Sequence, residues 1–172
     1  MAQRMLIRLT VNGDEYEAAV KPSDLLLEVL RDKLGLIGSK RGCDTGKCGA
    51  CTIIMDGKAV RSCLVLAVAA EGAEITTIEG LAVHDEMHPL QRAFVDHGAI
   101  QCGFCSPGMI MFAKSYLDEN PTASRAEIKE ALSANICRCT GYMKIIEAVD
   151  AVARENEAQA RAARPEGEIS GD

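Results

Sequence analysis

The chain has 172 residues, enough for one ordinary domain or two small ones. Its formal net charge of −6 argues against a nucleic-acid-binding protein. Aromatic residues make up only 3% of the chain and Trp is absent, so a small domain here needs another source of stability, such as bound metal or a partner surface.

The N-terminal segment lacks the features of a secretion signal, because Arg8 interrupts its short apolar run. No apolar stretch approaches the roughly 20 residues of a membrane span. We therefore expect a soluble, cytoplasmic protein with no membrane span. The chain has eight cysteines, and in a reducing cytoplasm such thiols favour metal ligation over disulfide bonds.

The first half of the chain predicts a small β-rich domain. Strands are expected over residues 7–11, 16–20, 52–55, 58–60 and 75–78, where apolar and polar residues alternate or short apolar runs end in turns. Asn12-Gly13 is a strong signal for a two-residue hairpin. A helix is expected from Pro22-Ser23-Asp24 to Gly35, and a Gly- and Cys-rich loop follows at 38–51.

The second half predicts helices. We expect them over 89–97, over 107–117, after the capping box Ser124-Arg-Ala-Glu127, and after Thr140, which can cap a fourth helix. Asn120-Pro121 breaks the second of these. The expected domains are residues 1–79 and 80–158, and the Ala-, Glu- and Arg-rich segment 159–172 is expected to be a disordered tail.

The first cysteine set is spaced C-x4-C-x2-C-x11-C and consists of Cys43, Cys48, Cys51 and Cys63. Its first three members match the plant-type [2Fe–2S] run. Glycines at 42, 46 and 49 would let the loop adopt positive φ and direct backbone N–H groups at an anionic cluster. A structural zinc site with four thiolates is the alternative, but zinc sites usually pair two C-x2-4-C turns, and Cys63 stands alone.

The second cysteine set combines two short motifs, Cys102-Gly-Phe-Cys105 and Cys137-Arg-Cys139. Both are expected near helix N-termini, where the helix dipole and free N–H groups favour thiolates and an anionic cluster. A redox dithiol of the thioredoxin kind would need a βαβ context that is absent from the pattern. Zinc stays open as an alternative from the spacing alone.

Three motifs in this order resemble a known family. They read Gly38-Ser-Lys-Arg-Gly-Cys43-Asp-Thr-Gly-Lys-Cys48-Gly-Ala-Cys51-Thr, then Gln101-Cys-Gly-Phe-Cys-Ser-Pro-Gly-Met109, then Asn135-Ile-Cys-Arg-Cys-Thr-Gly-Tyr142. Together they resemble the iron–sulfur subunit of the molybdenum hydroxylases, the xanthine oxidase and aldehyde oxidoreductase family. Lys47 and Ser106 depart from the commonest family pattern, and neither departure removes a ligand.

The resemblance implies an α+β fold, with an N-terminal β-grasp, plant-ferredoxin-like [2Fe–2S] domain and a C-terminal four-helix-bundle [2Fe–2S] domain. It implies that the first cysteine set ligates the outer cluster and the second set the inner cluster. Gln101 and Cys139 would then lie closest to the molybdopterin cofactor of a separate large subunit. Many relatives add a flavin (FAD) subunit as the next electron carrier.

The predicted function is electron relay within a molybdenum-containing hydroxylase or dehydrogenase complex, with no bond chemistry on this chain. A free-standing ferredoxin-type carrier is the alternative function. A zinc-stabilised interaction module without a redox role is a further one. The substrate of the complex is selected on another chain and cannot be predicted from these residues.

Overall fold

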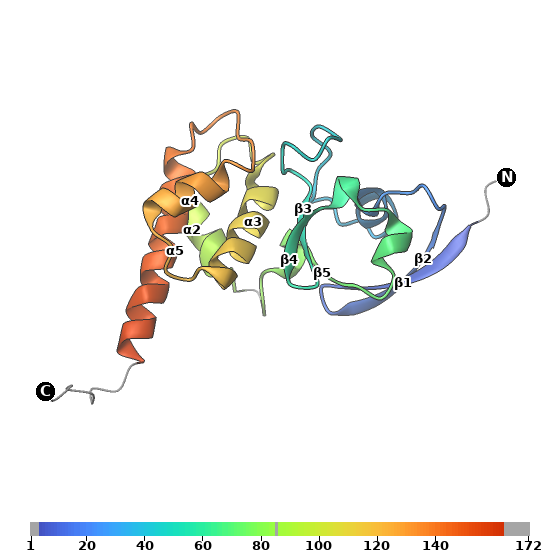
Figure 1. The fold of residues 1–172 in the computed structure, drawn as a ribbon, viewed down its shortest axis with the longest axis horizontal. Coiled ribbons are helices and arrows are strands. Elements are labelled where there is room, and N and C mark those ends of the chain that lie inside the picture. Colours follow the sequence, from blue (N-terminus) through green and yellow to red (C-terminus); the bar gives the residue numbers. More distant parts are fainter. Residues whose placement is uncertain (1–3, 85, 164–172) are drawn as a thin grey trace, which may run out of the picture.

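The computed structural model describes residues 4–84 and 86–163. Its first half is a five-stranded mixed sheet in the order β2-β1-β5-β3-β4, and its second half consists of helices (Figure 1). The strands are β1 (Met5–Val11), β2 (Asp14–Val20), β3 (Thr52–Met55), β4 (Lys58–Arg61) and β5 (Glu74–Thr76). This is the α+β class predicted from the sequence.

The β1–β2 hairpin follows the predicted turn. Val11 pairs with Asp14, so the loop contains only Asn12 and Gly13, and both have positive φ, at 55° and 88°. Such a turn matches the right-handed twist of the two strands. β1 also pairs in parallel with β5, which brings the end of the sheet domain back to its first strand.

The helix expected to end at Gly35 is shorter than predicted, and part of it is not an α-helix. It comprises α1 (Leu26–Glu28) followed by a π-helical turn (Val29–Lys33), closed by a hydrogen bond from Leu34 N to Val29 O of 3.1 Å. Four apolar residues of this segment are fully buried, namely Leu26, Leu27, Val29 and Leu30. Residues so close in sequence do not all lie on the one apolar face of a regular amphipathic α-helix. The wider turn is the local form that buries them.

The second half contains α2 (Pro89–Asp96), α3 (Ser106–Glu119), α4 (Arg125–Leu132) and α5 (Met143–Ala162). These helices share one apolar core, in which Phe94, Met109 and Ile145 are fully buried. The predicted capping box of α4 is present: the Ser124 hydroxyl accepts from Glu127 N, and the Glu127 carboxylate accepts from Ser124 N at 2.8 Å. None of the described helices is long and apolar enough to span a membrane.

The chain remains helical past the expected end of the second domain. α5 continues to Ala162, so residues 159–162 are helical and disorder does not begin at 159. Ala, Gln and Arg in this stretch are good helix formers, which explains why the helix extends beyond its buried stripe. The rest of the expected tail, residues 164–172, lies outside the described residues.

The two halves pack through α3, which lies along β3 and β4 (Figure 1). Ile54 of β3 belongs to the apolar core of the helices, and Ala59 N of the edge strand β4 donates to Ser115 Oγ of α3 at 3.0 Å. Gly108 allows the closest approach, because a Cβ there would lie 2.2 Å from Gly49 O. This contact brings the Gly- and Cys-rich loop against the start of α3.

Candidate metal centres

The first cysteine set is gathered by one loop and one short turn. Cys43, Cys48 and Cys51 lie on the loop before β3, and Cys63 lies on a 3₁₀ turn directly after β4. Cys51 Sγ and Cys63 Sγ are 3.3 Å apart, and Cys48 N donates to Cys43 Sγ at 3.3 Å. The Cys43 and Cys48 side chains are themselves within hydrogen-bonding contact, so the structure brings together the four thiols that the spacing singled out, in two pairs.

Backbone N–H groups of the loop point at the sulfur atoms. Gly46 and Gly49 both have φ of 74°, as the sequence led us to expect, and Thr45 N lies 3.5 Å from Cys43 Sγ. The third glycine acts differently: Gly42 does not have positive φ, but a Cβ there would lie 2.7 Å from Cys48 Sγ. Gly42 is thus needed for space and not for backbone freedom.

Two thiols of this set have opposite acidities. The hydroxyl and N–H of Thr45, with Cys48 N, donate to the sulfur and lower the pKa of Cys43 to about 6. Burial, and then the neighbouring Cys51 thiol, raise the pKa of Cys63 to about 11. The exposed side of the loop therefore favours a thiolate in the absence of metal, and the buried side favours a neutral thiol.

The second cysteine set joins two turns far apart in sequence. Cys102 and Cys105 precede α3, with Cys105 at its N-cap position, and Cys137 and Cys139 lie between α4 and α5. Cys139 Sγ and Cys102 Sγ are 3.6 Å apart, and the Cys105 and Cys137 side chains are within hydrogen-bonding contact. This set also divides into two pairs. Burial raises the pKa of Cys105 to about 12.

The turn around Cys137 differs from the predicted helix cap. The N-cap of α5 is Tyr142, with φ of 68°, so Thr140 does not cap this helix. Instead, Thr140 Oγ1 donates to Cys137 Sγ at 3.1 Å, and Thr140 N does so at 3.5 Å. Only the first motif of this set lies at a helix N-terminus. Thr140 supplies at Cys137 the donors that a helix end would have provided.

The paired thiols fit a binuclear cluster. Two thiolates on one tetrahedral ion with bonds of about 2.3 Å are about 3.8 Å apart, close to the two sulfur–sulfur distances above. Within residues 4–84 and 86–163, no three His, Cys, Asp or Glu side chains converge as they would on a single ion. Two thiolates for each of two irons is the donor set of a [2Fe–2S] cluster.

The two ligand loops touch each other directly. Ile136 N, next to Cys137, donates to Cys48 O at 2.9 Å. A cavity of about 190 Å³ opens between the loops, and its lining includes Cys48, Ala50, Cys102, Phe104, Cys137 and Cys139. The two cysteine sets thus adjoin one another through a backbone hydrogen bond and a shared cavity wall.

The remaining predicted site residue, Gln101, is exposed next to Cys102. Cys102 and Cys139 are also exposed, whereas Cys105 is partly buried and Cys137 is buried. The Cys102–Cys139 pair therefore faces solvent and lies beside Gln101. On the first set, Cys51 and Cys63 are buried and Cys43 is partly exposed.

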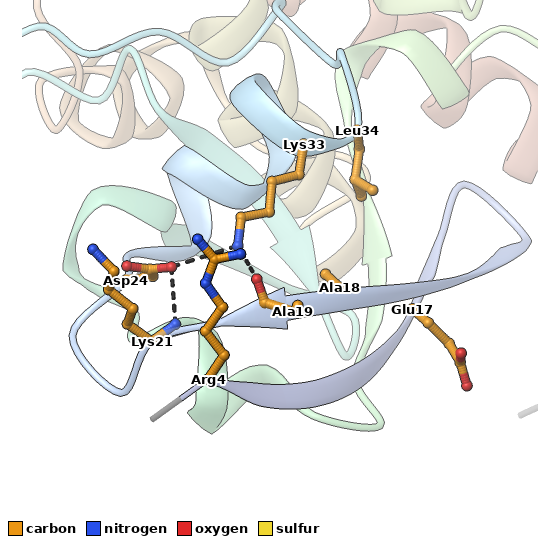
Figure 2. Close-up of a pocket in the computed structure, with 8 residues that line it drawn as sticks. All are labelled: Arg4, Glu17, Ala18, Ala19, Lys21, Asp24, Lys33 and Leu34. Atoms are coloured by element: carbon orange, nitrogen blue, oxygen red, sulfur yellow. Dashed lines mark hydrogen bonds and ion pairs between the residues drawn. The ribbon is translucent and has the colours of Figure 1, made fainter. Parts of the chain in front are cut away.

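A cavity elsewhere has no connection with the cysteines. It measures about 450 Å³, lies beside the β1–β2 hairpin, and is lined by residues that include Arg4, Lys21, Asp24 and Lys33 (Figure 2). It contains one ion pair and two contacts with backbone atoms: Lys33 Nζ lies 3.5 Å from Asp24 Oδ2 and also donates to Ala19 O, and Lys21 N donates to Asp24 at 3.0 Å. These contacts tie the hairpin to the helical turn that follows it.

Sequence reasoning missed the polar residues that connect the two sets. Arg61, Asn135 and Tyr142 all bond to groups on or beside the ligand loops. Asn135 and Tyr142 occur in the motifs above without an assigned role, and Arg61 ends a short strand that begins with another basic residue, Lys58. Their partners lie up to 86 positions away in the sequence, so no local pattern marks them.

Comparisons with known proteins agree with two cluster-binding halves. A family model described as "2Fe-2S iron-sulfur cluster binding domain" matches residues 9–82, and a second, "[2Fe-2S] binding domain", matches residues 77–150. The crystal structure of quinoline 2-oxidoreductase from Pseudomonas putida 86 contains a similar chain. It superposes with a TM-score of 0.86 at 48% identity, over 91% of this chain and 98% of that one.

Characterised relatives include separate subunits and longer chains. The nicotinate dehydrogenase small FeS subunit of Eubacterium barkeri is 45% identical over 146 residues, covering 85% of this chain and 93% of the relative. The aldehyde oxidoreductase of Megalodesulfovibrio gigas is 50% identical over 144 residues, but this match spans 82% of this chain and only 16% of the relative.

Two thiol sets on an α+β scaffold, with both cluster-binding domains matched, define a two-cluster iron–sulfur protein. The chain belongs to the iron–sulfur subunit family of the molybdenum hydroxylases, which includes the xanthine oxidases and aldehyde oxidoreductases. It is the electron-transfer subunit of an oxidoreductase.

Proposed function

We propose that this chain relays single electrons between the molybdopterin centre of a large partner subunit and an outer acceptor. The two [2Fe–2S] clusters supply one-electron redox centres, and the chain positions them. The observation that carries the proposal is the contact between the ligand loops, where Ile136 N bonds to Cys48 O at 2.9 Å. Two carriers held this close on one chain are suited to passing electrons from one to the other.

The proposed ligands are Cys43, Cys48, Cys51 and Cys63 for the first cluster. Those for the second cluster are Cys102, Cys105, Cys137 and Cys139. The pairing of sulfur atoms supports this assignment, because each set offers two thiols to each of two irons. The buried Cys51–Cys63 pair and the donors around Cys43 and Cys137 provide the low-polarity, hydrogen-bonded surroundings that tune such clusters.

The second cluster is proposed to face molybdopterin. Gln101 and Cys139 are the residues nearest to molybdopterin in this assignment. Both residues are exposed, and both lie beside Cys102, which supports the assignment. The first cluster is then the outer one. A flavin subunit carrying FAD is the proposed next acceptor, and the complex is proposed to act in the cytoplasm.

The domain limits follow from the same assignment. We propose a β-grasp, ferredoxin-like domain over residues 1–79 and a four-helix-bundle domain over 80–158. The overlap of the two family matches at 77–82 supports the boundary, and the shared apolar core of α2, α3, α4 and α5 supports the bundle.

Purification under anaerobic conditions tests the proposal. The expected product is a red-brown complex with a large molybdopterin-containing partner, four irons per copy of this chain, and two distinct electron paramagnetic resonance (EPR) signals after reduction. A colourless protein with stoichiometric zinc would contradict it.

The free-standing ferredoxin carrier is the alternative function. The relatives named as small subunits argue against it, as does the exposed Cys102–Cys139 pair, which a diffusing carrier would leave open to solvent. Gel filtration distinguishes the two. A monomer with full electron-transfer activity would favour the carrier, and stable elution with the large partner favours the subunit.

A further inference from the structure

Arg61 lies at the junction of the two halves, at the end of the edge strand β4. It immediately precedes the turn that carries Cys63, and its guanidinium carbon is 5.6 Å from the centre of the Phe112 ring of α3. A guanidinium over an aromatic face is held both by packing and by its charge. Arg61 is therefore fixed between a strand of one domain and a helix of the other.

The guanidinium group donates to both ligand-loop regions. On the first side, Arg61 Nε donates to Gly46 O at 3.3 Å, and Nη1 donates to Thr52 Oγ1. On the second side, Nη2 donates to Ala134 O at 2.8 Å and to Asn135 Oδ1 at 2.9 Å. One side chain thus connects the loop of the first cysteine set to the segment before Cys137.

Asn135 continues this connection from the interior. It is only 2% exposed, and its amide nitrogen donates to Gly108 O at 3.0 Å and to Gly49 O at 3.4 Å. With its oxygen on Arg61, all the polar atoms of the amide are used. A Cβ at Gly49 would lie 2.4 Å from the Asn135 side chain, so this close packing also requires glycine there.

Each end of the network reaches a proposed ligand. The backbone N–H of Gly46 donates to Cys63 Sγ, and the backbone carbonyl of the same residue accepts from Arg61 Nε. At the other end, Tyr142 Oη donates to Asn135 O and accepts from Cys137 N, both at 3.0 Å. The chain of contacts therefore runs from Cys63 through Arg61 and Asn135 to Cys137 without interruption.

We propose that Arg61 is a positioning residue whose guanidinium fork, acting through Gly46 and Asn135, holds the two cluster-binding loops at a fixed separation and orientation. The inference rests on the proposed function, because it assumes that both loops carry [2Fe–2S] clusters. Its consequence is uniform magnetic and electronic coupling between the clusters. A fork of fixed donors is required, since an ammonium cannot reach both loops with the same geometry.

The test uses the full-length chain purified with its clusters and partner subunits, fully reduced and studied by EPR at low temperature. In the wild-type protein we expect the two reduced clusters to interact and the interaction to split their signals. Arg61→Gln removes the charge and the fork, and Arg61→Lys keeps the charge but removes the fork. Both variants are expected to keep four irons per chain and to lose the resolved splitting through a spread of separations.

Arg8→Gln is the matched control. Arg8 is also at a strand position but is exposed, and among the described residues its side chain pairs with Glu17 at 3.0 Å, so the splitting is expected to stay at its wild-type value. Loss of splitting in Arg61→Gln with retention in Arg61→Lys would overturn the positioning role in favour of charge alone. Wild-type splitting in both variants would overturn the proposal entirely.

A second variant decides the matter if Arg61→Gln does not assemble. Tyr142→Phe removes only the hydroxyl that joins Asn135 O to Cys137 N, and the ring packing is kept. It is expected to broaden the split signals, and unchanged signals would contradict the proposed network. Absence of two iron–sulfur signals from the wild-type protein itself would instead refute the proposed function, so the two failures are distinguishable.

Discussion

The two cysteine sets each bring four thiols together, but by different means. The first is built mainly from one contiguous loop, in which glycine backbone and N–H groups surround the sulfur atoms. The second joins two turns that lie more than thirty positions apart and depends on the packing of α3 against its neighbours. The comparison shows that local backbone geometry can form one such site, whereas the other exists only after the helices have packed.

The two cysteine sets also differ in which of their thiols are exposed to solvent. The first set buries the Cys51–Cys63 pair and leaves Cys43 partly exposed, and the second exposes the Cys102–Cys139 pair. An exposed pair next to apolar Phe104, itself 46% exposed, is what a surface covered by a partner would present. The contrast agrees with a relay whose second site faces the large subunit.

The largest expected effects come from the cysteines themselves. Cys43→Ser is expected to remove the first cluster and to leave the second detectable, because the two sets share no ligand. Cys139→Ser is expected to do the reverse and to slow transfer from molybdenum. Iron content and EPR of the reduced proteins measure both outcomes. Loss of both signals from a folded variant would contradict two independent sites.

The contact between the start of α3 and the Gly- and Cys-rich loop should be sensitive to a single added methyl group. Gly108→Ala places a Cβ 2.2 Å from Gly49 O, a backbone atom that cannot rotate away. We expect the free energy of unfolding to fall by about 3 kcal/mol, with weaker retention of both clusters.

Gly98→Ala is the control for this variant. Gly98 has φ of 63° but no neighbour within 4 Å of the added Cβ, so only the backbone strain of about 1 kcal/mol is expected. Chemical denaturation of the two variants measures the difference. If both variants lost the same free energy of unfolding, the added Cβ at Gly108 would not be clashing with Gly49 O.

A pair of threonines gives a matched comparison of the two sites. Thr45 and Thr140 each donate a hydroxyl to a cysteine sulfur, Cys43 in the first set and Cys137 in the second. Hydrogen bonds to sulfur favour the reduced cluster, so replacing either Thr with Val should lower one reduction potential. A loss of about 1.4 kcal/mol corresponds to about 60 mV for one electron.

Redox titration followed by EPR reads both potentials in each variant. Thr45→Val is expected to shift only the first cluster, and Thr140→Val only the second. A shift of the same cluster by both substitutions would mean that the assignment of donors to sites is incorrect.

The smallest expected effect concerns the helical half alone. Ser124→Ala removes the hydroxyl half of the capping box of α4, keeps the backbone N–H that bonds to Glu127, and should lower the free energy of unfolding by about 1 kcal/mol. Hydrogen bonds from Ser124 hold the pKa of Glu127 below 4.5, so the folded state gains from its ionisation. This contribution is present above the unfolded-state pKa and is lost as the pH falls through the lower folded-state value.

The difference between wild type and Ser124→Ala is therefore expected to narrow in acid. Ser133→Ala, at an exposed position just after α4, is the control and should change little. Denaturation at neutral pH and below pH 4.5 measures both variants. A difference that is independent of pH would exclude a contribution from the Glu127 carboxylate.

Features encoded in neighbouring residues were predicted correctly. The Asn12-Gly13 turn and the α4 capping box were identified because turn and cap chemistry involves residues two to four positions apart. The π turn at Val29, the left-handed Tyr142 and the role of Gly42 were missed. Each of these depends on burial or on a sulfur atom brought close by other parts of the chain.

The sequence by itself determined the two cysteine sets, their order and the family, because the cysteine motifs are local and long enough to be specific. Only the tertiary structure decided which sulfur atoms pair and how the two loops meet. The hydrogen bonds from Arg61 to Asn135 and from Ile136 to Cys48 join residues that are remote in sequence. They form only when α3 packs on β3 and β4, so the sequence pattern carries no local sign of them.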